Sequence, residues 1–358
     1  MELESMFDII LKRHQKKYEL NSTDGREILY KDFLKDDFEV SVIFLAIMTI
    51  SISVGLIGNI LVIGGVSVYR KLRTTGNVFI VNLAVADLIV VTVIQPFNMI
   101  GIIVGPRFFH GKLEALCHMV STICVMSCAC SMMTLAVIAH NRYIFVCKNL
   151  RYKTLYSKKK IMIYIILIWL IGGLADLPNY LNWGEHTFDY ETMSCFFDRH
   201  VLKYMLFISI VEYWIPLTFV VVCYTLIYIY VRKQRNQFRN QMAKCSSANE
   251  YVLSIRQHQD LRMIRTFVLV VVIFVLCWVP YFLLALFDRD ENVPKIGYVL
   301  TLAIGHCNSS INSILYCATN KRFRIGYKMF IWNHCCKWFV PDDNKETNST
   351  GNTVSTNT

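Results

Sequence analysis

Asp87 is an ionisable side chain in the middle of an apolar stretch with the sequence NLAVADLIV. A carboxyl group at mid-membrane depth is costly, and such groups usually serve a function. Polar side chains expected at similar depth are Asn59, Ser131, Asn308 and Asn312. One carboxylate with several neutral oxygen donors can hold a desolvated sodium ion. A protonated Asp87 in a hydrogen-bonded network is the alternative, because burial disfavours the charged form.

Two further motifs combine a polar or bulky side chain with a helix end or a hinge. His140-Asn141-Arg142-Tyr143 closes an apolar run, where Arg142 can act as a switchable latch or as a simple snorkelling anchor. Cys277-Trp278-Val279-Pro280 places a large ring beside a proline hinge, and Phe274 lies one turn away. A ring in that position can convert ligand contact into helix rotation.

Seven apolar runs of membrane-spanning length position these residues. They cover about 40–68, 77–103, 115–140, 161–180, 204–230, 267–287 and 295–318. With 54% hydrophobic and only 18% charged residues, the 358-residue chain does not resemble a soluble enzyme, a disordered protein or a nucleic-acid-binding domain. We therefore expect an all-α, multi-pass membrane protein with no nucleic-acid partner.

The charges predict the orientation of the spans. Segments 70–73, 141–160, 231–266 and 319–358 have a net charge of +19, whereas the segments on the opposite side have −5. Because positive loops stay in the cytosol, the N-terminal segment 1–39 is expected outside and the tail 333–358 inside. The spans form one domain over 40–318, and an amphipathic eighth helix is expected over 319–332. No secretory signal peptide is evident, so the first span is expected to direct insertion.

Modifications follow from the same orientation. Asn21 begins an acceptor sequon for glycosylation on the outer segment. Among 13 cysteines, Cys117 and Cys195 fall at the outer edge, where a disulfide would tie the third span to the 181–203 loop. Cys335 and Cys336 follow the amphipathic stretch, where palmitoylation and unmodified thiols both fit.

The chain resembles the rhodopsin-like (class A) G-protein-coupled receptors. The resemblance rests on Gly58-Asn59, NLAVAD, the Cys117/Cys195 pair, Asn141-Arg142-Tyr143, Trp169, Pro216, Tyr224, Cys-Trp-x-Pro at 277–280, and Asn312 to Tyr316. It implies a plasma-membrane seven-helix receptor, not an enzyme, whose partners are an extracellular ligand, membrane lipids and a heterotrimeric G protein. No cofactor is expected except a possible allosteric sodium ion.

Within this class the chain is most similar to the melatonin receptors. It shares Asn141-Arg142-Tyr143, the NRY-x₆-LRY-x₂-LYS stretch to Ser157, and a seventh span with Asn312-Ser313 in place of the usual proline motif. The resemblance implies ligand contacts at Asn179 and Phe197. Arg199 and Glu212 replace the family's glutamine and histidine, and Asp176 is a further acidic newcomer, so the ligand stays undetermined.

The candidate residues form two sets. The resemblance and the span positions suggest a ligand pocket of Cys124, Val125, Cys128, Asn179, Phe197, Arg199, Glu212, Trp278 and Tyr281. The activation and G-protein set is Asn141, Arg142, Tyr143, Tyr224, Asp260, Phe274, Trp278 and Tyr316. Asp260 is a candidate partner for Arg142, with a solvated loop residue as the alternative.

Other functions remain open at this level. The outer acids Asp176, Glu212, Asp288, Asp290 and Glu291 also suit a receptor for a short basic peptide. A transporter or channel would predict repeated halves or several charged pore residues, which the sequence lacks. No His/Cys spacing typical of a metal site is evident, and His118, His140 and His306 are interpreted as packing or hydrogen-bonding groups.

Overall fold

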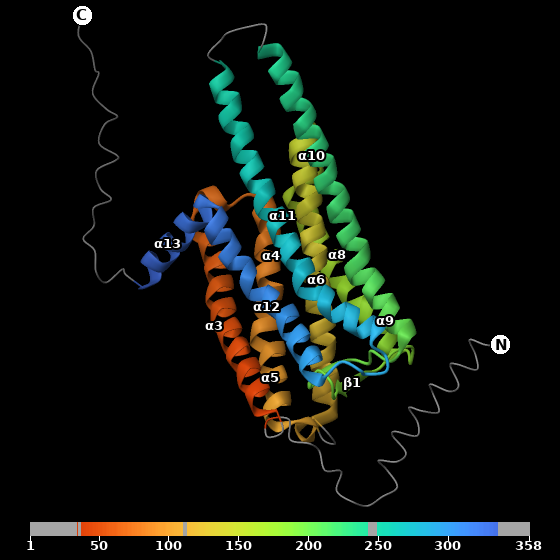
Figure 1. Cartoon of the computed structure of the whole chain (residues 1–358). Coiled ribbons are helices and arrows are strands. Elements are labelled where there is room, and N and C mark those ends of the chain that lie inside the picture. The colour runs from red at the N-terminus through yellow and green to blue at the C-terminus, as the bar shows by residue number, and fades with distance from the viewer. Residues whose placement is uncertain (1–33, 35–36, 110–112, 243–248, 336–358) are drawn as a thin grey trace, which may run out of the picture.

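The computed structural model describes residues 34, 37–109, 113–242 and 249–335, with only the backbone at 235, 238–242, 249–267 and 335. Its helices are α3 (Phe38–Val68), α4 (Thr75–Ile89), α5 (Gln95–Val104), α6 (Glu114–Cys147), α7 (Asn149–Leu155), α8 (Lys158–Tyr180), α9 (Leu202–Ile208), α10 (Ile215–Met242), α11 (Asn249–Phe287), α12 (Lys295–Thr319) and α13 (Lys321–Cys335). Short turns η1 (Arg70–Leu72) and η3 (Pro106–Phe108) flank the second span. Figure 1 shows a bundle of long, roughly parallel helices with α13 turned away at one end.

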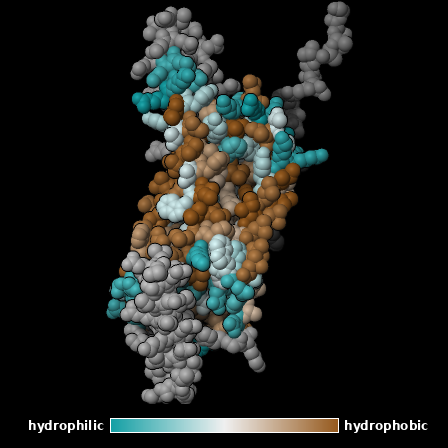
Figure 2. Space-filling model, turned by 90° about the vertical axis from the view of Figure 1, so that its right-hand side faces the viewer, coloured by the Kyte–Doolittle hydropathy of each residue, from teal (hydrophilic) through white to brown (hydrophobic). Residues whose placement is uncertain are grey.

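Six of the predicted spans are long and apolar enough to cross a membrane, by length and composition among the described residues. They are Phe38–Val68, Thr75–Val104, Glu114–Cys147, Lys158–Tyr180, Leu202–Gln234 and Val268–Phe287. Helix α12 completes the seven-helix bundle but is less apolar, since it buries His306, Asn308 and Asn312 among its neighbours. Figure 2 shows hydrophobic side chains over the middle of the visible face and hydrophilic ones toward both ends. The predicted seven-helix fold is confirmed.

Two spans contain a turn of π-helix directly before a proline. Segment η2 (Val90–Ile94) precedes Pro96, and η5 (Ser209–Trp214) precedes Pro216. Proline has no N–H and its ring crowds the preceding turn, so the local hydrogen-bond ladder must shift. Such π-bulges re-aim side chains and are frequent at functional sites. The second one contains Glu212.

The helices run beyond the predicted spans at the end of the bundle that carries α13, called the α13 end below. Helix α10 continues to Met242, and helix α11 begins at Asn249. Most of the expected 231–266 link is therefore helical. Arg, Lys and Gln in this region favour helix once it leaves the membrane. Helix α13 packs on α3, and the Tyr327 hydroxyl donates to the Ser313 carbonyl oxygen at 3.2 Å.

A β-hairpin covers the opposite end, called the hairpin end below. Strands β1 (His186–Asp189) and β2 (Ser194–Phe197) pair antiparallel, with Phe188 opposite Cys195. The disulfide between Cys117 and Cys195 joins β2 to α6, which confirms the predicted pairing. The hairpin is the one sheet in the part of the chain that is described, and it adds to the all-α architecture expected from the sequence.

Candidate ligand site and activation site

Trp278, on α11, lies at the centre of the bundle and faces α12. Its ring meets the His306 ring edge-on, with centroids 5.5 Å apart, and contacts Tyr281 and Phe282 at 6.3 and 6.1 Å. A β-carbon at Gly305 would lie 3.1 Å from the indole, so glycine permits this close approach. Phe274 continues the series of rings at 6.5 Å and stacks on Tyr213. A shift of Trp278 would therefore disturb both helices.

Helix α6 contributes Cys124, Val125 and Cys128 to the same region, as the sequence suggested. The Cys124 sulfur lies 3.5 Å from His306 Nε2. On the other side of the His306 ring, Nδ1 is 3.1 Å from the Asn98 side-chain nitrogen. The imidazole is thus held between α6 and α5.

Aromatic rings from β2 form the roof of this region. Phe197 and Phe196 are both buried, with centroids 4.3 Å apart. Phe196 meets Tyr281 edge-on at 5.8 Å, and Phe197 meets Tyr204 at 5.6 Å. The disulfide fixes these two rings over the bundle because Cys195 is adjacent to Phe196.

Asn179 belongs to a polar cluster beside this roof. Its amide nitrogen donates to Asp176 Oδ1 at 2.9 Å and lies 3.3 Å from His186 Nε2. His186 is also 3.1 Å from the Asp176 carboxylate, and the Tyr204 hydroxyl donates to the same carboxylate at 3.3 Å. Asp176 is therefore saturated by protein partners, whereas Asn179 Oδ1 is buried with no partner among the described residues.

Glu212 differs from Asp176 in this respect. Its Oε1 atom is buried and has no hydrogen-bond partner among the residues that the structure describes. The Tyr281 hydroxyl, on α11, is in the same condition. An unpartnered buried polar group costs free energy, so each is suited to a polar group of a ligand.

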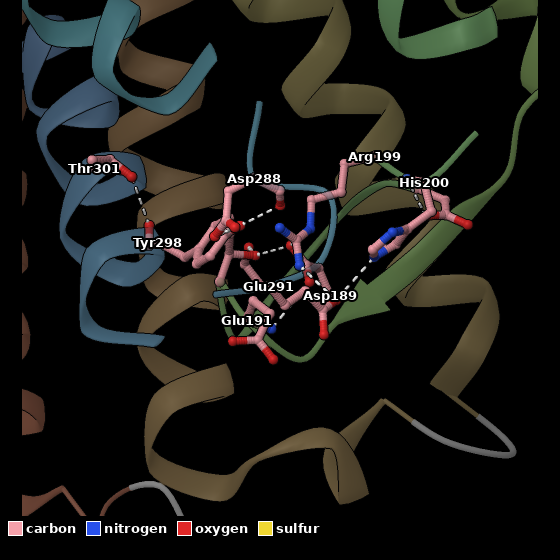
Figure 3. A network of polar contacts seen from close by, with 11 residues as sticks. Asp189, Glu191, Arg199, His200, Asp288, Glu291, Tyr298 and Thr301 are labelled. Atoms are coloured by element: carbon pink, nitrogen blue, oxygen red, sulfur yellow. Dashed lines mark hydrogen bonds and ion pairs between the residues drawn. The ribbon is translucent and has the colours of Figure 1, made fainter. Parts of the chain in front are cut away.

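Arg199 is part of an ion-pair network between the hairpin and the 288–294 loop (Figure 3). Its guanidinium lies 3.0 Å from Glu291 and 3.5 Å from Asp189, and stands over the Tyr298 ring at 4.2 Å. Burial opposes the charge on Arg199, but the Asp189 carboxylate together with Tyr281 and Tyr298 outweighs this effect and raises the arginine pKa. Its charge is thus matched by loop carboxylates, and His200 Nε2 also contacts Glu291 at 3.2 Å.

Asp288 closes the same loop. Its carboxylate accepts hydrogen bonds from the backbone N–H groups of Asn292 and Val293 at 2.9 and 2.8 Å, and from the Tyr298 hydroxyl at 2.7 Å. The bond from Val293 is the main cause that lowers the pKa of Asp288 below its ordinary value of 3.8. Asp189, Asp288 and Glu291 are therefore engaged in contacts that hold the loops at this end together.

The predicted sodium-site residues Asn59, Asp87, Ser131, Asn308 and Asn312 are all buried. Asn312 donates to Asp87 Oδ2 at 2.8 Å, and Ser131 approaches the carboxylate. Asn59 instead donates to the Ser309 carbonyl oxygen at 3.0 Å. Asp87 Oδ1 and Asn308 Oδ1 are buried without a partner among the described residues.

The activation residues lie at the α13 end. Arg142 is buried on α6 and interacts electrostatically with the hydroxyls of Tyr224 and Tyr316. Asn141 donates to the Tyr152 hydroxyl at 3.3 Å, and Tyr143 packs 6.5 Å from the His140 ring. This assembly joins α6, α10 and α12.

Some predicted residues lie outside the described part of the chain. These are Asn21 and Cys336, together with the side chains of Asp260 and Cys335. The backbone at 260 belongs to α11 rather than to a loop.

Sequence reasoning did not assign several residues to the candidate sites that they contact, among them His306, which it interpreted only as a packing or hydrogen-bonding group, His186 and Ser309. His306 meets Cys124 and Trp278, His186 meets Asp176 and Asn179, and Ser309 approaches Asp87. The depth of His306, six residues before Asn312 in the seventh span, is a signal that could have identified it. His186 lies in a loop whose hairpin no pattern in the sequence predicted.

Two hollows open on the flanks of the bundle. One is lined by Glu114, His118, Thr122 and Tyr180 among others, between α6 and α8. The second lies between α9–η5 and α11, beside Trp214 and Phe282. Trp278 lines neither of these two hollows. The candidate ligand site is instead defined by the polar and aromatic groups that surround Trp278.

Comparison with known proteins identifies the class. The sequence matches the family described as 7 transmembrane receptor (rhodopsin family) over residues 58–316. The chain belongs to this family. It is therefore a receptor and not an enzyme, and it is a multi-pass protein of the plasma membrane.

Individual relatives make the resemblance more specific. The chain is 32% identical over 311 residues to melatonin receptor type 1A of Mus musculus, with 84% of each chain covered. It is 28% identical over 320 residues to an alpha-1A adrenergic receptor of Oryzias latipes, covering 81% of this chain and 67% of that one. The structure of squid rhodopsin has the same fold, with a TM-score of 0.70, 22% identity, and 83% and 87% of the two chains covered. The predicted likeness to melatonin receptors is confirmed.

The Asp288 contacts predict a pH-dependent loop. Because the folded pKa is depressed, the carboxylate stabilises the loop above pH 3.8, and this contribution is lost as the pH falls through the lower folded value. At neutral pH, Asp288→Asn should speed hydrogen exchange at Asn292 and Val293 severalfold. The exposed neighbour Asp290, changed to Asn, is the control. Equal exchange in both variants at neutral pH would contradict this role.

Proposed function

We propose that this chain is a ligand-activated receptor that binds a small molecule near Trp278 and activates a heterotrimeric G protein at the α13 end. The observation that carries the proposal is the burial of Arg142, within Asn141-Arg142-Tyr143, between Tyr224 and Tyr316. A buried arginine at the membrane edge needs partners from several helices. It can therefore change partners when those helices move.

Two features support a proposed orientation with the hairpin end outside and the α13 end in the cytosol. A disulfide at the hairpin end suits an oxidising extracellular environment. The basic segments have a net charge of +19, which suits the cytosol and its anionic lipids, and the parts of them that the structure describes lie toward the α13 end. G-protein coupling at the cytosolic end is supported by membership of the family.

The series of rings from Tyr281 through Trp278 to Phe274 supports the coupling between the ends. A ligand shifts the equilibrium only by its difference in affinity for the two arrangements. An agonist that displaces Trp278 would favour a new position of α11 beyond the Pro280 hinge. Arg142 would then exchange partners beside Tyr224 and Tyr316, opening the docking face.

The polar groups favour a ligand that carries hydrogen-bond donors. Glu212 Oε1 and Asn179 Oδ1 are acceptors without partners among the described residues, whereas Asp176 is already satisfied. An amine or hydroxyl on an aromatic frame fits these acceptors and the Phe196–Phe197 roof. Indoleamines belong to this group, although a neutral ligand such as melatonin would leave a charged Glu212 uncompensated.

A basic-peptide receptor is the second candidate within the class. The outer acids in the sequence suggest it, but Glu291 pairs with Arg199, and Asp288 accepts two hydrogen bonds within its own loop and a third from Tyr298 on α12. A peptide would have to displace these contacts. The geometry therefore favours the small molecule.

A sodium ion is a further proposal for the Asp87 region. Asp87 Oδ1 and Asn308 Oδ1 are buried oxygens with no partner among the residues that the structure describes, and Ser131 and Ser309 approach the Asp87 carboxylate. This oxygen-rich set fits a monovalent cation. The ion would supply positive charge opposite Asp87, and Asn312 would orient the carboxylate.

The coupling proposal is tested by Arg142→Ala. We expect it to abolish nucleotide exchange driven by the most potent compound from a screen of indoleamines, biogenic amines and short peptides, while surface expression persists. Lys203→Ala, at an exposed position of the opposite end, is the control. Unchanged exchange in Arg142→Ala would remove the arginine from the mechanism.

Glu212→Gln tests the ligand class. It should weaken a cationic ligand by about 1.5–3 kcal/mol, the scale of a charge-assisted hydrogen bond, and leave a neutral ligand nearly unaffected. Potency in the exchange assay measures the difference. Glu114→Gln, at an exposed position, should not change potency. Equal potency of cationic ligands at wild type and Glu212→Gln would exclude this contact.

Asp87→Asn tests the sodium site. A tenfold excess of Na⁺ over its Kd stabilises the folded state by about 1.4 kcal/mol, which raises the melting temperature by a few degrees. The wild type should show this rise in NaCl relative to choline chloride, and Asp87→Asn should not. A rise of the same size in both proteins would place the ion elsewhere.

A further inference from the structure

Cys124, Cys128 and His306 converge from two helices beneath the hairpin. One sulfur from each cysteine and one ring nitrogen of the histidine lie within 4.8 Å of one another. The cysteines are four residues apart and so share one face of α6, while His306 faces them from α12. No short-range spacing in the sequence indicates this group, because 182 positions separate Cys124 from His306.

The Cys124–His306 distance matches a tetrahedral metal site. Zinc bonds of about 2.3 Å to sulfur and about 2.0–2.1 Å to nitrogen place two ligand atoms about 3.5 Å apart. Cys124 Sγ and His306 Nε2 are 3.5 Å apart. Cys124 and His306 are buried, and Cys128 is partly accessible.

The surroundings also suit a metal ligand. A coordinating histidine usually donates its second ring N–H to an oxygen, which fixes its orientation. Asn98 lies 3.1 Å from His306 Nδ1, and its amide can turn its oxygen toward that nitrogen. Glu212 interacts electrostatically with Cys128, and its Oε1 has no partner among the described residues, so its carboxyl group is a candidate for the fourth position.

We propose that Cys124, Cys128 and His306 bind a transition-metal ion of the zinc class. Two thiols each lose a proton to solvent, two S–Zn bonds form, and neutral His306 donates the Nε2 lone pair. Two thiolates balance the charge of Zn²⁺, so with a neutral fourth ligand, such as a protonated Glu212, the bound group is neutral, as a membrane interior requires. Thiolate and imidazole ligands select zinc over magnesium and calcium, which prefer oxygen.

The site has a consequence for signalling that is independent of the agonist. The ion would join α6 to α12 at the ring that contacts Trp278 at 5.5 Å. A bond across these helices resists any rearrangement that separates them. Zinc would thus bias the equilibrium between the two arrangements of the receptor.

Zinc binding to the purified full-length receptor tests the proposal directly. ZnCl₂ should raise the melting temperature of the wild type, and Cys128→Ser or His306→Gln should lower the zinc affinity at least tenfold. Asn98→Ala should lower it by about 10–100-fold, the scale of losing a supporting contact. Cys130→Ser is the matched control, because Cys130 is on the same helix but approaches the Ile168 carbonyl oxygen instead. Equal affinity in wild type and Cys128→Ser, or equal loss in Cys130→Ser, would overturn the site.

A second measurement uses only the wild-type receptor, so it tests the site even if the substituted variants do not fold. Mass spectrometry after maleimide labelling should show that ZnCl₂, but not MgCl₂, protects Cys128, the more accessible of the two cysteines. Cobalt substitution should give thiolate-to-metal charge-transfer absorption. Labelling of Cys128 at the same rate with and without zinc would overturn the proposal.

Discussion

The polar side chains and carbonyl groups on one face of α12 need hydrogen-bond partners inside the bundle, and the rest of the structure depends on this requirement. Lipid offers no hydrogen bonds, so buried polar groups in a span need protein partners. Asn59 and Gln95 donate to the carbonyl oxygens of Ser309 and His306, and Asn312 donates to Asp87. Gly58 allows the close approach of α3, because a β-carbon there would collide with Ser313. These contacts fix the rotation of α12.

That rotation determines the position of every candidate site. It presents His306 to Cys124 and Trp278 in the middle of the bundle, and Tyr316 to Arg142 at the α13 end. The Asp87 region lies between them. A rearrangement of α12 or α11 therefore reaches the ligand site, the proposed sodium site and the arginine together, which is what a two-state receptor requires.

Much of the fold could be predicted from the sequence because lipid imposes simple rules on length, apolarity and charge. The seven spans and the Cys117–Cys195 disulfide were predicted, and the structure contains them. The saturation of Asp176 by His186, the pairing of Arg199 with Glu291, and the Cys124–His306 contact could not be read from the sequence. Each joins residues whose approach depends on helix rotation or loop path, which periodicity does not determine.

The central claim is that a donor-bearing small molecule near Trp278 drives G-protein activation at the opposite end. Nucleotide exchange on a purified heterotrimer with reconstituted wild-type receptor, screened with indoleamines, biogenic amines and short basic peptides, tests it most directly. We predict saturable stimulation by at least one small amine-bearing compound. Stimulation by basic peptides alone would contradict the claim.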